Sequence, residues 1–227
     1  GYIKRCECML EAWGWPGALE VQLGQLVNLF RDGKAVRMSK RTGEMVTFEE
    51  LIEEVGVDAT RYLMLSRSAD QPIDFDIEVA KKKDASNPVY YVQYAHARIC
   101  SILRKAADPA DAAAAEAGEI TMGELAARII PEDCDLSPLT HESELALMRK
   151  MADFGNLVAL AARDRAPFRL THYAQDLASL FHQFYTNCHV LVDDAAVQTA
   201  RLALVDATRI VLALTLSLLG VSAPEKM

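Results

Sequence analysis

The stretch NPVYYVQYAHAR, residues 87–98, decides the fold of this 227-residue chain, because it opens a long series of helical segments. Proline suits the first turn of a helix, where its missing N–H would have no intrahelical partner. Helical periodicity runs on to Ala106 and returns near residues 122–130, 140–151, 154–163, 167–191 and 194–219. The Ala- and Asp-rich stretch 107–118 is expected to be a surface connection, and Gly220 a C-terminal cap. Residues 87–227 are therefore predicted to form an all-α bundle.

Two shorter units are predicted before this bundle. In residues 1–46 we expect a helix over residues 3–13, a strand over 26–30 and a tight Asp-Gly hairpin at residues 31–34. In residues 47–86, Thr47 and Glu50 have the spacing of a capping box, which starts a helix that ends near Gly56. Asp58 is expected to cap the helix that follows.

A short basic loop, RMSKR at residues 37–41, follows the hairpin. Between Arg31 and Glu44 the chain carries five basic and two acidic residues. Such a loop can close over a triphosphate, with Lys40 as a compact charge on a pyrophosphate leaving group and Ser39 donating to its oxygens. On these five residues alone, a solvated basic turn is the commoner explanation.

The loop is similar to the KMSKS signature of class I aminoacyl-tRNA synthetases, in the form found in bacterial arginyl-tRNA synthetases, with Arg37 in place of the first lysine. The resemblance extends beyond the loop and keeps the same order along the chain. It includes GQLVNL at 24–29, VDATRY at 57–62, DFD at 74–76, the stretch 87–98 and the ending GVSAPEKM at 220–227. It therefore covers nearly the whole sequence.

This resemblance implies a mainly α fold, with a remnant of a Rossmann-like catalytic core at residues 1–46 and an anticodon-binding bundle of the DALR type at 87–227. Residues 47–86 would form the connecting region, with 66–68 and 74–76 as its irregular parts. The family's HIGH-type motif and most of its arginine pocket lie in the first half of its nucleotide-binding domain. We therefore expect the chain to be a C-terminal fragment of a longer synthetase, and to be inactive alone.

The activity implied for the parent is arginine–tRNA ligation, in which ATP activates arginine and the product is passed to tRNA(Arg). Lys40 and Ser39 would be the catalytic residues of the loop, and Arg37, Met38 and Arg41 would join them in binding ATP. Mg²⁺ is expected to accompany ATP, although the sequence shows no dedicated metal site.

The candidate RNA-binding residues are Asn87, Tyr91 and Tyr94, which share a helical face at spacings of four and three. They offer an amide for base edges and two rings for stacking. The spacing fits a packed aromatic stripe equally well, and the resemblance favours binding. It also places Tyr185 and Met227 at the anticodon.

A second match to the family is the tetrapeptide at residues 206–209, which reads DATR where the family has DALR. Asp206 and Arg209 are three residues apart on one helix, so we expect them to pair structurally rather than to bind RNA.

Charge and composition narrow the partners. The net charge of −8 argues against indiscriminate nucleic-acid binding, so RNA contacts should be local and DNA is not expected as a partner. The apolar run 210–219 is too short for a membrane span. Five cysteines without a Cys-x-x-Cys pair indicate a reducing, cytoplasmic location. His182, Cys188 and His189 do not share one helical face, so no metal site is predicted.

A different class of function stays open on the sequence, namely a noncatalytic RNA-binding or scaffold protein derived from a synthetase. The basic loop favours the enzyme, because a pure binder would have no use for it. Another ATP-dependent ligase with a similar loop is disfavoured by the predicted anticodon-type bundle.

Overall fold

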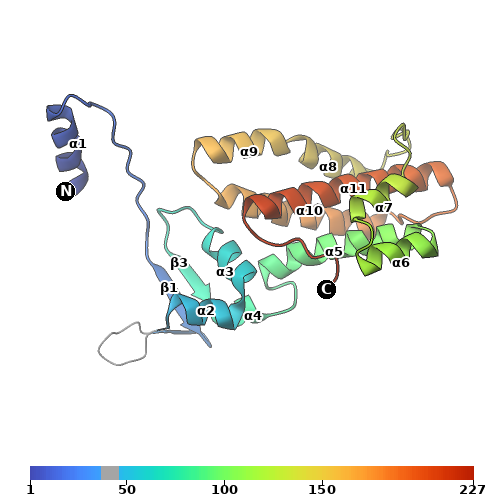
Figure 1. The fold of residues 1–227 in the computed structure, drawn as a ribbon, viewed down its shortest axis with the longest axis horizontal. Helices are drawn as coiled ribbons and strands as arrows, with labels where there is room; N and C mark the ends of the chain where they lie inside the picture. The colour runs from blue at the N-terminus through green and yellow to red at the C-terminus, as the bar shows by residue number, and fades with distance from the viewer. Residues whose placement is uncertain (37–45) are drawn as a thin grey trace.

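The computed structural model describes residues 1–36 and 46–227. It shows a mainly α-helical chain with one small sheet, which confirms the predicted fold class (Figure 1). The sheet and its short helices occupy the N-terminal third, and a bundle of longer helices occupies the rest. The predicted basic loop, residues 37–41, lies outside the described residues. The domain boundaries at 46/47 and 86/87 remain predictions.

The N-terminal part begins with helix α1 (Tyr2–Ala12), which has no buried residue and stands apart from the rest of the chain (Figure 1). An extended segment leads from it to strand β1 (Val27–Arg31). Strand β2 (Lys34–Ala35) pairs antiparallel with β1, and strand β3 (Ile73–Asp76) pairs parallel with β1 on its other side. Asp32 and Gly33 form the predicted hairpin turn, with φ of 51° and 71°. This turn type requires positive φ at both central positions, and Asp and Gly tolerate it.

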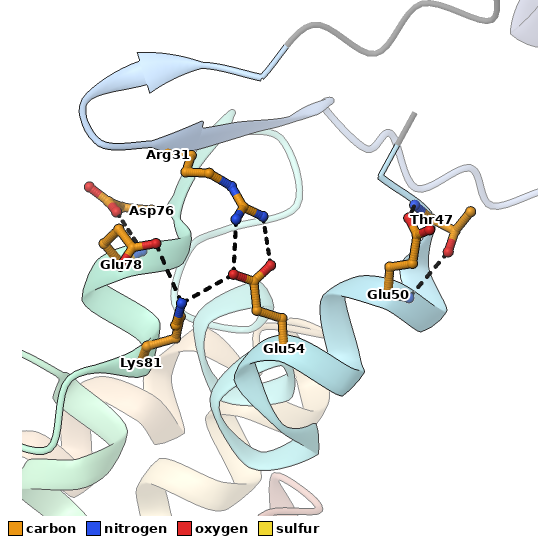
Figure 2. A network of polar contacts seen from close by, with 7 residues as sticks. All are labelled: Arg31, Thr47, Glu50, Glu54, Asp76, Glu78 and Lys81. Atoms are coloured by element: carbon orange, nitrogen blue, oxygen red, sulfur yellow. Dashed lines mark hydrogen bonds and ion pairs between the residues drawn. The ribbon is translucent and has the colours of Figure 1, made fainter. Parts of the chain in front are cut away.

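Three short helices, α2 (Phe48–Val55), α3 (Val57–Met64) and α4 (Ile77–Lys81), pack beside the sheet. The predicted capping box is confirmed, because the Thr47 hydroxyl accepts from the Glu50 N–H and the Glu50 carboxylate accepts from the Thr47 N–H. Figure 2 shows that Glu54 of α2 accepts from Arg31 of β1, at 2.6 and 3.0 Å, and from Lys81 of α4, at 3.2 Å. This ion-pair network ties the sheet to both helices.

The bundle contains helices α5 (Pro88–Ala106), α6 (Pro109–Ala117), α7 (Met122–Ile129), α8 (Glu142–Ala152), α9 (Phe154–Arg163), α10 (Phe168–Asn187) and α11 (Ala195–Leu218). Helix α5 is central, because it packs against α10 and α11 within the bundle and against α3 of the connecting region. Among the fully buried side chains of the bundle are Phe181, Phe184 and Leu103. The core of the bundle is thus continuous with that of residues 47–86.

Gly220 ends α11 with φ 66°, as predicted, and the Val221 N–H returns to the Leu216 carbonyl at 2.9 Å. The last residues, which we call the C-terminal tail (221–227), then run back beside α5 (Figure 1).

Three local expectations were wrong. Residues 107–118 are not a connection but contain α6, which Asp108 caps at its N-terminus and Pro109 begins. Residues 74–76 belong to strand β3 rather than to an irregular segment. Asp58 lies inside the first turn of α3, whose N-cap is Gly56, and its carboxylate is used elsewhere.

Candidate nucleic-acid interface

An open cavity of about 710 Å³ lies between the part of α5 from Tyr94 onward, the end of α10 and the C-terminal tail. Three of the predicted RNA-binding residues line it, namely Tyr94, Tyr185 and Met227. They are separated by up to 133 residues in sequence, and they come together because α10 and the tail both run along α5 in the same direction as α5. Tyr94 is 37% exposed and Met227 54% exposed, so both present apolar surface to the cavity.

Arg98 contacts both of the tyrosines that line this cavity. Its guanidinium lies 4.3 Å from the centre of the Tyr185 ring, and its Nη1 donates to the Tyr94 hydroxyl at 2.7 Å. Arg98 follows Tyr94 by four residues, so the helical repeat places both on one face of α5. The arrangement combines two rings with a cation stacked on one of them, which is how single-stranded bases and their phosphates are commonly held.

The charge of the cavity is positive, although the whole chain is acidic. Four basic side chains, Arg98, Arg104, Lys105 and Lys226, and two acidic ones, Glu116 and Glu225, line it. Arg104 pairs with Glu225 at 3.0 Å, and Lys226 pairs with Glu116 at 3.0 Å. Arg98 and Lys105 have no carboxylate partner among the described residues. They are the cations left for an anionic ligand.

Tyr91 has a different environment from Tyr94. It is half-buried, and its ring centre lies 5.0 Å from that of His182 on α10. The centre of the His182 ring also lies 6.1 Å from that of Tyr94, so His182 packs against both tyrosines. Burial lowers the pKa of His182, and the nearby charge of Arg98 lowers it further. A neutral imidazole is thereby favoured between the rings.

Asn87 is 4% exposed and serves as the N-cap of α5. Its Oδ1 accepts from the Val89 N–H at 3.2 Å, and its Nδ2 donates to the carbonyls of Ala80 and Lys82 at 2.9 Å each. These bonds occupy both amide hydrogens, which the prediction assigned to a base edge. In this structure Asn87 joins α4 to α5, and any contact with RNA would require it to exchange these partners.

The tail that carries Met227 is fixed at several points along α5. Gln93 donates to the Ser222 carbonyl at 3.0 Å, and His96 Nδ1 lies 2.9 Å from the Pro224 carbonyl oxygen. Burial lowers the pKa of His96, so the neutral ring donates to this carbonyl. With the Arg104–Glu225 pair, these contacts place the chain terminus at the mouth of the cavity.

Several residues of the cavity were missed at the sequence level. Arg98 could have been found from its spacing of four from Tyr94, but an arginine on an amphipathic helix is usually a solvated residue. Arg104, Glu116 and Lys226 carried no such signal, because their pairing depends on the path of the tail.

Asp206 and Arg209 form the predicted structural pair, with Arg209 Nε donating to Asp206 Oδ1 at 2.7 Å. Their side chains are only 16% and 13% exposed. Neither lines the cavity.

Nothing in residues 1–36 and 46–227 groups three or more His, Cys, Asp or Glu side chains around a possible metal position. In the same residues, no helix combines the length and apolarity that crossing a membrane requires. The predicted ATP-binding residues, Arg37, Met38, Ser39, Lys40 and Arg41, lie outside the part of the chain that the structure describes.

Comparison with known proteins places this chain in a family. The model of the DALR anticodon binding domain matches residues 92–227, which include α5 beyond its first turn, α10 and the tail. The chain is 49% identical to an arginine–tRNA ligase of Heliobacterium modesticaldum and 50% identical to one of Desulforudis audaxviator. Each match covers 100% of this chain and 38% of the relative. The chain thus spans well under half the length of these relatives.

Solved structures agree with this assignment. A Campylobacter jejuni structure assigned as an arginyl-tRNA synthetase superposes with a TM-score of 0.81 at 29% identity, over 100% of this chain and 45% of that one. The arginyl-tRNA synthetase of Thermus thermophilus superposes with a TM-score of 0.64 at 26% identity, over 90% of this chain and 35% of that one. With its matched bundle and these relatives, the chain belongs to the DALR anticodon-binding domain family, in the form carried by arginyl-tRNA synthetases.

Proposed function

We propose that this chain supplies tRNA(Arg) anticodon recognition to an arginine–tRNA ligase, and that the bases bind in the cavity beside α5. The observation that carries this proposal is the convergence of Tyr94, Tyr185 and Met227 on one cationic cavity. Base stacking on an aromatic ring contributes about 1 to 3 kcal/mol per base. Two tyrosines and a methionine can therefore hold splayed anticodon bases, while Arg98 and Lys105 meet their phosphates.

The catalytic part of the proposal concerns the loop 37–41. Lys40 and Ser39 stabilise the pyrophosphate that leaves when arginine attacks the α-phosphate of ATP, and Arg37, Met38 and Arg41 contribute to the nucleotide site. Mg²⁺ binds with the ATP phosphates rather than in a protein cage, which suits a metal that keeps several waters and few carboxylates. The similarity of the whole chain to arginine–tRNA ligases supports this catalytic role of the loop.

Anticodon recognition is tested by comparing tRNA(Arg) with the same tRNA carrying an altered anticodon. The complete gene product should bind the unaltered tRNA more tightly, and Tyr94→Ala should reduce that preference. Equal affinity for both tRNAs would refute anticodon recognition by this cavity.

Ligase activity is tested by arginine-dependent exchange of pyrophosphate into ATP, with tRNA(Arg) present. The complete gene product should catalyse exchange, whereas residues 1–227 alone should not. A complete gene product that binds tRNA(Arg) but never exchanges pyrophosphate would instead be the noncatalytic RNA-binding protein that the sequence leaves open.

A further inference from the structure

A second cavity, of about 610 Å³, lies at the N-terminal end of α5. The junction of α2 and α3, the end of α4 and the start of α5 line this open cavity. Its lining includes three consecutive lysines, Lys81, Lys82 and Lys83, and the aromatic residue Tyr90. Neither these lysines nor Tyr90 belongs to the anticodon cavity described above.

The lysines differ in their availability. Lys81 is held by Glu54 at 3.2 Å and by Glu78 at 3.6 Å, as Figure 2 shows. Lys82 and Lys83 are exposed and have no ion-pair partner in the described part of the chain. Two cations are therefore available to a ligand at the mouth of this cavity.

The acidic residues of the lining are already neutralised or hydrogen-bonded. Glu54 pairs with Arg31 and Lys81, and these partners lower its pKa. Asp58 accepts from Gln93 Nε2 at 2.8 Å and from the Ser222 N–H at 3.1 Å. Lys82 and Lys83 thus outnumber the one lining carboxylate that lacks a cationic partner within the described ranges, Asp58, on a chain whose net charge is −8.

Asn87 fixes the segment that carries these lysines. Its two amide hydrogens bind the carbonyls of Ala80 and Lys82, and its Oδ1 caps α5. A side chain that is 4% exposed thereby holds the lysine segment against the helix that carries the anticodon cavity. The lysine segment and the anticodon cavity are therefore held in fixed positions relative to each other.

One helix face connects the two cavities. Tyr90 lines the second cavity and Tyr94 lines the first, and their rings stack with centres 6.3 Å apart and an interplanar angle of 12°. Arg98, Ser101 and Lys105 continue the same face at helical spacing and line the first cavity. From Tyr90 to Lys105 this face is about 22 Å long, at about 1.5 Å per residue.

We propose that the second cavity is a binding site for the sugar-phosphate backbone of the tRNA whose anticodon enters the first cavity, with Lys82 and Lys83 contacting phosphates and Tyr90 extending the stacking face. This proposal rests on the proposed function. Because Tyr90 in the second cavity stacks on Tyr94 in the anticodon cavity, we expect one RNA to occupy both cavities. Side-by-side exposed lysines on an open surface suit successive phosphates rather than one enclosed anion.

The test compares Lys82→Ala/Lys83→Ala with the parent in the complete gene product, using tRNA(Arg) at several salt concentrations. Loss of two phosphate contacts should reduce the slope of log affinity against log salt by about 1.4 to 1.8. Between 50 and 200 mM salt, the parent should therefore lose about 7- to 12-fold more affinity than the variant. Arg149→Ala on α8, which removes an exposed cation away from both cavities, should leave the slope unchanged.

The same measurements separate this proposal from anticodon recognition. Preference for the unaltered anticodon should persist in the lysine variant and fall in Tyr94→Ala. An unchanged salt slope in the lysine variant, with the anticodon preference intact, would overturn the backbone site and leave the proposed function standing. If the parent itself shows no anticodon preference, the proposed function fails whatever the slope. A melting temperature equal to that of the parent would show that the lysine variant is folded.

Discussion

Asp58 of α3 accepts hydrogen bonds from both the backbone N–H and the hydroxyl of Ser222, which lies 164 residues later in the C-terminal tail. The same carboxylate accepts from Gln93 on α5. One side chain of the connecting region therefore holds the central helix of the bundle and the segment that ends at Met227. Because Met227 lines the proposed anticodon cavity, residues 47–86 take part in shaping a surface that lies outside them.

Replacing Asp58 tests this relationship. Asp58→Ala should destabilise the fold by about 1 to 3 kcal/mol, because it removes bonds to a charged acceptor and leaves Gln93 short of a partner. tRNA(Arg) binding should weaken as well, since the tail loses its anchor. Asp70→Ala is a matched control, because its carboxylate is exposed and, within residues 1–36 and 46–227, is bonded only by Ser68. Urea unfolding and tRNA affinity give the two readouts, and an Asp58 variant that behaves like Asp70→Ala would contradict the role of the tail.

The two predicted stacking tyrosines should behave differently when they are replaced. Tyr94→Ala should weaken binding of tRNA(Arg) by about ten- to a hundredfold with little change in melting temperature, because the ring is partly exposed in the cavity. Tyr91→Ala should lower the melting temperature, because its ring packs against His182 and the core.

Tyr2→Ala is the control for an exposed tyrosine, since Tyr2 is 80% exposed on α1. Affinity and melting temperature must be measured together. If both variants melt well below the parent, or both bind tRNA as tightly as the parent, neither tyrosine is an anticodon contact.

The proposed catalytic loop gives a kinetic prediction. Lys40→Ala in the complete gene product should lower kcat for adenylate formation by about 10² to 10³, the loss expected when one preorganised electrostatic donor is removed. ATP–pyrophosphate exchange measures it. An unchanged kcat with a raised KM for ATP would assign Lys40 to ground-state binding of ATP.

The tail should also make stability depend on pH. Burial lowers the pKa of His96 in the folded chain below its usual 6.5, whereas the unfolded chain retains that ordinary value. Between the two pKa values the unfolded state binds more protons, so the free energy of unfolding rises with pH. The contribution of His96 to the free energy of unfolding should therefore be fully present above about pH 6.5, and it should be lost as the pH drops below that value.

Melting temperatures recorded between pH 5 and 8 check this dependence. His182 contributes in the same direction, because burial lowers its pKa too. The fall at low pH should be shallower in His96→Gln than in the parent, and shallower again when His182→Gln is added. Parallel curves for the three proteins would exclude both histidines as its source.

The sequence was most informative where the signal is local. Thr47 with Glu50, Asp32 with Gly33, and Asn87 with Pro88 each specify backbone geometry within four residues, and the structure has all three features. The stretch 107–118 was misjudged because its low complexity outweighed the Asp108 cap, Pro109 and an alanine run of high helix propensity.

Features that depend on long-range packing were less accessible. β3 is only four residues long, and it is a strand because β1 pairs with it 46 residues away. Asp58 has the sequence position of a helix cap, yet its carboxylate accepts hydrogen bonds from Ser222 and Gln93. For the same reason, Tyr94, Tyr185 and Met227 could be nominated singly through the family resemblance, whereas their common cavity with Arg98 follows only from the path of α10 and the tail.

A buried ion pair between α8 and α11 gives a final prediction about what holds the bundle together. Arg201 Nε donates to Glu144 Oε1 at 2.7 Å, and the Glu144 side chain is fully buried. The other oxygen of Glu144 accepts from the His141 N–H at 2.8 Å. Arg201→Met would leave a buried carboxylate without its counter-charge, which typically destabilises a protein by about 3 to 5 kcal/mol.

For a chain of this size, that loss corresponds to a fall of about 6 to 20 °C in melting temperature. Arg149→Met provides the comparison, because its pair with Glu142 is exposed on both sides and should contribute under about 1 kcal/mol. Adding Glu144→Gln to Arg201→Met should restore part of the lost stability, since a neutral amide can still accept from His141 without burying a charge. If Arg201→Met melts like Arg149→Met, the buried pair does not hold α8 against α11, and apolar packing alone accounts for that contact.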